Sequence, residues 1–214
     1  QANNNWLQNP WWCAYQFKNS NVRDRFITSA NLRYNIFDWL WVQGQIGMDY
    51  YTRDNDFLVP QGTGYLRGGS KSESTNWNRE VNQEWMLGGD KAFGKFRVNA
   101  FVGGNKMVRE NQTVSANGNT FNIPFFTAVG NTQSQSFGYS YGKAGINSLY
   151  GSAELSYNNY LFVTATAPND WFSVLNPAHN SVLYPSLGGS FVFTDAFKNL
   201  PKVLTYGKLR VAWG

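Results

Sequence analysis

The residues best suited to chemistry in this 214-residue chain are few, and they form no catalytic set. His179 is the one histidine, and Ser181 follows it two positions later. A hydrolytic triad also needs an acid and a nucleophile motif, whereas Pro177 and Asn180 are typical of a loop. We therefore expect no enzymatic activity.

Metal and cofactor sites have little more support. The acidic stretch 54–56 offers oxygen ligands for calcium, but no further ligands stand at the spacing of a calcium loop. Cys13 is the single cysteine, which excludes an intrachain disulfide and a cysteine-based zinc cluster. Residues 138–144 only loosely match a phosphate-binding loop, because Ala144 replaces the metal-binding hydroxyl. We expect no metal and no cofactor.

The composition narrows the class of protein. Charged residues make up 14% of the chain and aromatic residues 17%, which is low in charge and rich in aromatics for a soluble domain. The net charge is +5, but Lys and Arg are scattered singly, so nucleic-acid binding is not expected. No apolar run reaches the ~18 residues of a membrane helix. A membrane barrel stays open, because its strands need only about ten alternating residues.

Helical periodicity is nearly absent, and the elements that would position side chains are alternating runs. In 40–53, for example, Leu40, Val42 and Ile46 alternate with polar residues that include Gln45 and Asp49. This pattern predicts strands with one dry and one wet face. The runs cover about 24–37, 40–53, 80–93, 95–108, 147–158, 160–167, 184–195 and 204–214.

The lengths of the runs and of their connections favour a membrane barrel. Several runs exceed the ~5–6 residues of soluble strands, and a strand crossing an outer membrane needs about 9–11. Short connections at 38–39, 94, 158–159 and 196–203 alternate with long ones at about 54–79, 109–146 and 168–183. Short turns at one rim and long loops at the other are typical of such barrels, so we expect the long loops to be extracellular.

Aromatic residues recur at each short connection, as expected for a ring at a membrane–water interface. They are Phe37, Trp39, Trp41, Phe93, Phe96, Tyr157, Tyr160, Phe193, Phe197 and Tyr206. We therefore predict an all-β, antiparallel transmembrane β-barrel with lipid on the dry faces. About eight strands could close a narrow barrel or form an arc of a wider one. The sequence begins without Met and ends within an alternating run, so we expect a piece of a longer polypeptide.

A series of short motifs carries a family resemblance. In chain order they are Asn9-Pro10-Trp11-Trp12, Asp38-Trp39-Leu40, Asn147-Ser148-Leu149-Tyr150-Gly151, Asn169-Asp170-Trp171, Tyr184-Pro185-Ser186 and Gly207-Lys208-Leu209-Arg210. Over essentially the whole chain, this series resembles the SusC-like TonB-dependent transporters of the Bacteroidetes outer membrane. One departure is Ala167-Pro168, where the family tends to have Gly-Arg, so any role of that arginine is in doubt.

The resemblance implies that residues 1–214 are part of a single barrel domain of about 22 strands. It also implies a plug outside this chain through which TonB supplies energy, and a SusD-like surface lipoprotein as lid. The expected function is import of oligosaccharides, or of peptides, across the outer membrane. The alternative is a complete small outer-membrane barrel that acts as a structural anchor or adhesin. An enzyme on a barrel and a soluble carbohydrate-binding β-sandwich have less support.

Two groups of residues are the candidate sites. Contacts to substrate or lid are predicted for Asn169, Asp170, Trp171, Trp77, Trp11 and Trp12, with Trp6 and Tyr65 as further loop aromatics. Such aromatics stack on sugars or partner proteins, although Asn and Asp also stabilise turns and Trp anchors at interfaces. Lumen-facing positions are predicted for Arg25, Arg33, Arg53, Arg97, Glu154, Lys208 and Arg210. These contact substrate or plug through charge-assisted bonds, or else are solvated wall residues.

Overall fold

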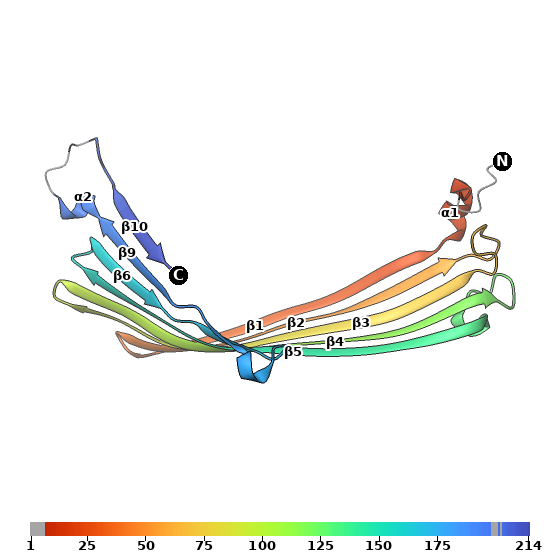
Figure 1. The fold of residues 1–214 in the computed structure, drawn as a ribbon, viewed down its shortest axis with the longest axis horizontal. Helices are drawn as coiled ribbons and strands as arrows, with labels where there is room; N and C mark the ends of the chain where they lie inside the picture. Colours follow the sequence, from red (N-terminus) through yellow and green to blue (C-terminus); the bar gives the residue numbers. More distant parts are fainter. Residues whose placement is uncertain (1–6, 198–200, 202) are drawn as a thin grey trace. The chain divides into compact units, whose positions relative to one another are not determined.

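The fold is an antiparallel β-sheet whose main strands follow one another in chain order (Figure 1). The structure, a computed structural model, describes residues 7–197, 201 and 203–214. The main row is β1 (Asn19–Phe37), β2 (Leu40–Val59), β3 (Ser70–Phe93), β4 (Phe96–Phe121), β5 (Thr132–Tyr157), β6 (Leu161–Thr166), β9 (Ser186–Val192) and β10 (Lys208–Trp213). The eight predicted strands and the predicted antiparallel all-β fold are confirmed.

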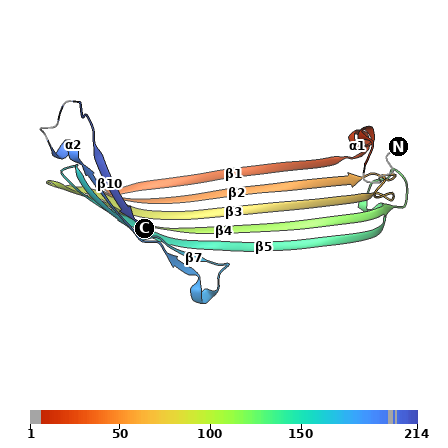
Figure 2. The same cartoon turned by 45° about the horizontal axis from the view of Figure 1, so that its top comes forward.

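A short hairpin lies outside this row. It consists of β7 (Asn169–Phe172) and β8 (Ser181–Leu183), joined through a 3₁₀ turn, η2 (Pro177–His179). β7 pairs with β5, from Ile146 opposite Phe172 to Leu149 opposite Asn169, so it continues the pairing that β6 makes along β5. Figure 2 shows β7 next to β5. The expected loop 168–183 is therefore largely a paired hairpin.

The described residues fall into two compact units, and β1–β5 contribute to both. Unit 1 comprises the described residues up to Ile27, Asp49–Glu80 and Arg109–Lys143. Unit 2 comprises the described residues of Thr28–Met48, Val81–Val108 and Ala144–Gly214. Unit 1 holds the connections 60–69 and 122–131, and unit 2 holds the short turns.

In unit 2 the register separates two chemically different faces. Leu155 lies opposite Val163, which lies opposite Gly189. One position along, Glu154 lies opposite Thr164. Residues that are paired across strands share a face, and neighbours along a strand point to opposite faces. We call the side of Leu155 the apolar face and the side of Glu154 the charged face.

The sheet has almost no core of its own. Only Leu58, Phe121 and Val192 are buried hydrophobic residues in the part of the chain that the structure describes. Large apolar side chains such as Leu32 (77% exposed) and Ile46 (49%) have no cover. This extent of exposed apolar surface demands a non-aqueous or protein neighbour, which contradicts the soluble β-sandwich reading. No helix among the described ranges combines the length and apolar character needed to cross a membrane.

The short turns carry part of the predicted aromatic row, including Phe96, Tyr157 and Tyr160, whereas Trp41 lies against Arg33 instead. Asn158 and Asn159 have φ of 48° and 60°, the positive values that a two-residue type I′ hairpin requires and that Asn tolerates. Consecutive rings meet across the strands: Phe96 and Tyr157 at 4.9 Å, and Tyr157 and Tyr160 at 5.6 Å. The row continues to Phe191, whose ring centre lies 6.0 Å from that of Tyr160.

The prediction of long structureless loops at 54–79 and 109–146 is wrong. These residues mostly extend β2–β5, and the irregular connections are confined to 60–69 and 122–131. Along the same strands, many of the alternate positions that are apolar in unit 2 are occupied in unit 1 by polar residues. One example is the ion pair of Lys71 and Asp56 at 2.5 Å. The hydropathy alternation that marks a strand is therefore lost, although the backbone pairing continues.

Two short helices were not predicted. α1 (Pro10–Gln16) begins where the Asn9 side chain accepts a hydrogen bond from the Trp11 backbone N–H at 2.9 Å, with proline in the first turn. α2 (Phe193–Ala196) replaces the end of the run predicted over 184–195. Helices of seven and four residues are too short for a helical periodicity to be detected, so neither helix produces a clear sequence signal.

Candidate functional site

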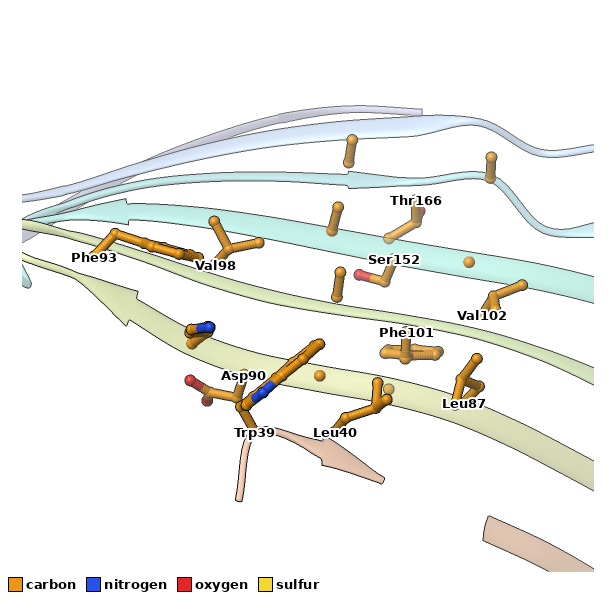
Figure 3. Close-up of a pocket in the computed structure, with 18 residues that line it drawn as sticks. Trp39, Leu40, Leu87, Asp90, Phe93, Val98, Phe101, Val102, Ser152 and Thr166 are labelled. Atoms are coloured by element: carbon orange, nitrogen blue, oxygen red, sulfur yellow. The ribbon is translucent and has the colours of Figure 1, made fainter. Parts of the chain in front are cut away.

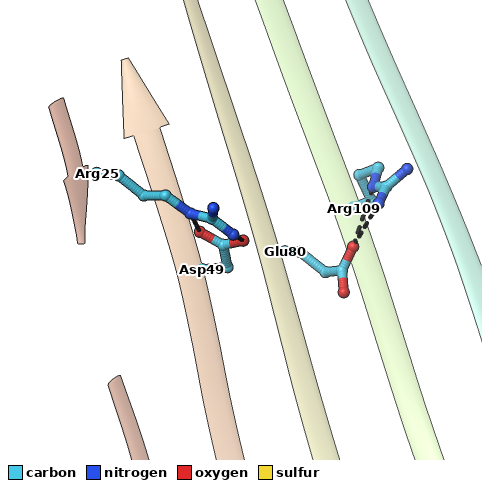
Figure 4. A network of polar contacts seen from close by, with 4 residues as sticks. All are labelled: Arg25, Asp49, Glu80 and Arg109. Atoms are coloured by element: carbon cyan, nitrogen blue, oxygen red, sulfur yellow. Dashed lines mark hydrogen bonds and ion pairs between the residues drawn. The ribbon is translucent and has the colours of Figure 1, made fainter. Parts of the chain in front are cut away.

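In unit 1, the side of the sheet that carries Arg25 and Asp49 has ion pairs between neighbouring strands, and we call it the charged face of unit 1 (Figure 4). Arg25 on β1 donates from Nε to Asp49 Oδ1 on β2 at 2.8 Å, and its Nη2 binds the second oxygen. Arg109 on β4 donates from Nε and Nη2 to Glu80 Oε2 on β3 at 3.0 and 2.7 Å. Both arginines keep more than two fifths of the side chain exposed, so the pairs remain open to solvent.

Unit 2 also has an ion pair between neighbouring strands, and there an aromatic ring contacts a further arginine. Arg97 donates from Nε and Nη2 to the two Asp90 oxygens at 2.6 and 2.7 Å. Arg33 lies over the Trp41 ring, 4.3 Å from its centre. The Trp41 ring rests on β3 at Gly88, where an added Cβ would come within 2.6 Å of Trp41 Cε2. Glycine therefore makes room for the ring, and the ring orients the guanidinium.

The rest of the charged face in unit 2 combines hydroxyls, carboxylates and amines. Thr164 Oγ1 donates to Glu154 Oε2 at 3.1 Å, and the Tyr150 hydroxyl donates to Glu84. Lys208 Nζ lies 5.2 Å from the centre of the Phe162 ring, and Arg210 lies opposite Ser190.

The predicted lumen-facing residues follow the charged side of their strands. Glu154, Lys208 and Arg210 share one face by register. Arg53 stands four positions from Asp49 along β2 and so points to the same side. Its Nε is buried and has no hydrogen-bond partner among the described residues.

The residues predicted to contact substrate or lid are divided between the two units. Asn169, Asp170 and Trp171 lie in β7 of unit 2 rather than in a loop. Asn169 exchanges hydrogen bonds with the Ser181 hydroxyl at 3.0 and 3.1 Å, which binds the hairpin together. Trp171 is 37% exposed. The Asn169 side chain therefore stabilises the strand pairing, and Trp171 is the exposed residue of the three.

The predicted tryptophans of unit 1 also lie in regular elements. Trp12 on α1 donates from Nε1 to Thr63 Oγ1 at 3.2 Å, which anchors the helix to the connection 60–69. Trp11 is 70% exposed and stacks on Tyr15 at 5.8 Å. Trp77 on β3 faces the Tyr50 ring at 6.5 Å.

Tyr50 adjoins Asp49 in β2, so Tyr50 and Trp77 lie on the side away from the charged face. Tyr65 lies in the connection 60–69, and Trp6 lies outside the described residues.

Sequence reasoning missed the acidic half of the site. Asp49, Asp90 and Glu80 each neutralise an arginine on the adjacent strand. These partners could be recognised as acidic residues that lie on the same face of a neighbouring strand as the arginine. Recognising them requires the register, which the sequence leaves open because the connections vary in length.

The charged surface is built from paired and partly solvated side chains. The described residues contain no group of three or more His, Cys, Asp or Glu side chains able to hold a metal. In each unit, paired and solvated charges present hydrogen-bond donors and acceptors. Such a surface suits weak, repeated hydrogen bonding to a solute or to a facing protein surface.

The fold is similar to solved transporter structures. The RagAB peptide transporter matches with a TM-score of 0.87 and 13% identity over 95% of this chain and 23% of that chain. The 'open-open' state of the RagAB peptide importer gives 0.87 and 14% over the same shares. BauA, the ferric preacinetobactin receptor of Acinetobacter baumannii, gives 0.50 and 10% over 81% and 28%. Neither a protein-family model nor a curated protein sequence matches the chain.

These structural matches, at low sequence identity, establish the fold. The resemblance predicted from the motif order is confirmed at the level of fold. The chain spans under a quarter of the length of the RagAB chains that it matches.

Proposed function

We propose that this chain is part of the wall of a SusC-like, TonB-dependent importer in the bacterial outer membrane. The supporting observation is the two-faced sheet of long antiparallel strands that matches RagAB over 95% of the chain. The apolar face contacts lipid, and the charged face lines the lumen.

The charged face supports a transport role rather than a catalytic one. Several of its charges are paired between strands, so a solute passes hydrogen-bonding groups without meeting one tight site. A SusD-like lipoprotein closes the entrance, and TonB acts through a plug that lies outside this chain. The exposed Trp11–Tyr15 stack on α1 is available for contact with the lid or with substrate.

The substrate is an oligosaccharide or a short peptide. The RagAB neighbours are peptide importers, which favours the peptide. The open row of strands, with β1 and β10 at its two ends, favours an arc over the small complete barrel.

Uptake by cells tests the proposal. Cells with the full-length protein should accumulate labelled peptides or labelled oligosaccharides, and deletion of tonB should abolish that uptake. Purification in mild detergent should also recover a surface lipoprotein in fixed proportion. Uptake that persists without TonB would refute the importer mechanism.

A further inference from the structure

A groove of about 930 Å³ crosses the apolar face of unit 2 over β3, β4, β5 and β6 (Figure 3). Its floor consists of positions with little or no side chain. They are Gly89, Ala100, Gly151, Ala153 and Ala165. Larger apolar side chains surround this floor, among them Leu87, Val98 and Val102. The groove is as large as many ligand sites.

A cation is fixed at the end of the groove nearest the short turns. Lys91 Nζ lies 5.0 Å from the centre of the Trp39 ring and 5.5 Å from that of Phe93. No ion pair within the described part of the chain involves Lys91. The adjacent Asp90 pairs with Arg97 on the charged face. The groove therefore ends in an ammonium group that no carboxylate neutralises.

We propose that this groove binds one acyl chain of an anionic glycerophospholipid, with its phosphate beside Lys91. The inference rests on the proposed function, because it requires the apolar face to contact a bilayer. The short turns then lie at the periplasmic rim, so the lipid belongs to the inner leaflet. Trp39 and Phe93 lie at headgroup level, where aromatic side chains concentrate.

Charge and shape favour this occupant over others. A hydrocarbon chain replaces water over the apolar floor without leaving polar groups unsatisfied. A sugar or peptide would lose its hydrogen bonds there. The position of Lys91, at the headgroup end, matches a lipid with its charge at one end and favours anionic headgroups.

Native mass spectrometry of the full-length protein, extracted in detergent and supplied with dioleoyl phosphatidylglycerol or dioleoyl phosphatidylcholine, tests the inference. Wild type should retain one phosphatidylglycerol after other lipids dissociate. Ala153→Phe fills the floor and should lower that occupancy about tenfold, as expected for losing most of an apolar contact. Lys91→Gln should lower the preference for phosphatidylglycerol over phosphatidylcholine about fivefold, as expected for one cation near a headgroup.

The matched control is Ala30→Phe, which places the same ring on the apolar side of β1 outside the groove and should leave occupancy unchanged. Equal lipid retention by Ala153→Phe and Ala30→Phe would show that the bound lipid is ordinary boundary lipid. The proposed binding groove would then be wrong. Ala165→Phe repeats the test if Ala153→Phe does not fold.

Heat-modifiable migration on gels separates the two levels of failure. A folded barrel with unselective lipid retention refutes the groove alone. A full-length protein that never forms a heat-modifiable species refutes the proposed function, and the groove with it.

Discussion

At the scale of single residues, Gly88 determines where the Trp41 ring and the Arg33 guanidinium lie. We predict that Gly88→Ala displaces the ring and destabilises the folded barrel by about 1–3 kcal/mol, the usual cost of overpacking. Urea titration of the full-length protein in lipid vesicles, followed by tryptophan fluorescence, measures this. Gly44→Ala is the control, because no atom lies within 4 Å of an added Cβ there. Equal effects of the two substitutions would contradict the stacking argument.

Glu110 supplies a second prediction at this scale, outside the segments that cross the membrane. Lys143 Nζ lies 2.9 Å from its Oε1, Arg79 binds the other oxygen, and the Tyr141 hydroxyl donates at 3.2 Å. Lys143 first, and then Arg79, lowers the pKa of Glu110 from its ordinary 4.5 to about 2. The folded state therefore holds this carboxylate charged at pH values where the unfolded chain protonates it.

The stabilisation from Glu110 is complete above about pH 4.5 and disappears as the pH falls toward 2. We expect the urea midpoint of wild type to fall across this window and that of Glu110→Gln to fall less. The comparison uses titrations at several pH values in the same vesicles. Parallel curves for the two proteins would show that the ion pairs of Glu110 contribute nothing.

At the scale of elements, the stability of the barrel depends on which side of each strand faces lipid. Ile46 lies on the apolar side of β2 and is 49% exposed, whereas Gln45 points the other way. Ile46→Arg should cost about 2–4 kcal/mol if it lies near the bilayer midplane, and Gln45→Arg should cost far less. Unfolding titrations in vesicles compare them. A silent Ile46→Arg with a disruptive Gln45→Arg would invert the assignment of faces.

The sequence predicts strands well only where one side of the strand is apolar. Residues 147–157 of β5 alternate clearly and the sequence predicts a strand there, whereas it predicts a loop over 132–146 of the same strand. Beyond the apolar zone, ion pairs such as Lys143–Glu110 replace apolar contacts, so the pattern disappears while the backbone ladder continues.

The alternation of polar and apolar residues along each strand predicts which residues lie on the charged side, Arg25 and Arg97 among them. Their partners Asp49 and Asp90 could not be predicted, because a one-residue change in register would exchange the faces. The hairpin of Asn169 and Ser181 was missed because short strands carry too few residues for alternation to be recognised.

At the scale of the whole molecule, the two ends of the strand row make a clear prediction. β1 and β10 each have one edge without a partner strand in the described chain. In a bilayer, unpaired backbone groups cost several kcal/mol each, so an open arc is not viable by itself. Residues 1–214 expressed alone should therefore aggregate or fail to insert into vesicles, while the full polypeptide forms a heat-modifiable barrel. Gel migration before and after boiling distinguishes these results. A heat-modifiable 24.2 kDa species from residues 1–214 alone would mean that these strands close on themselves, and the anchor or adhesin would replace the importer.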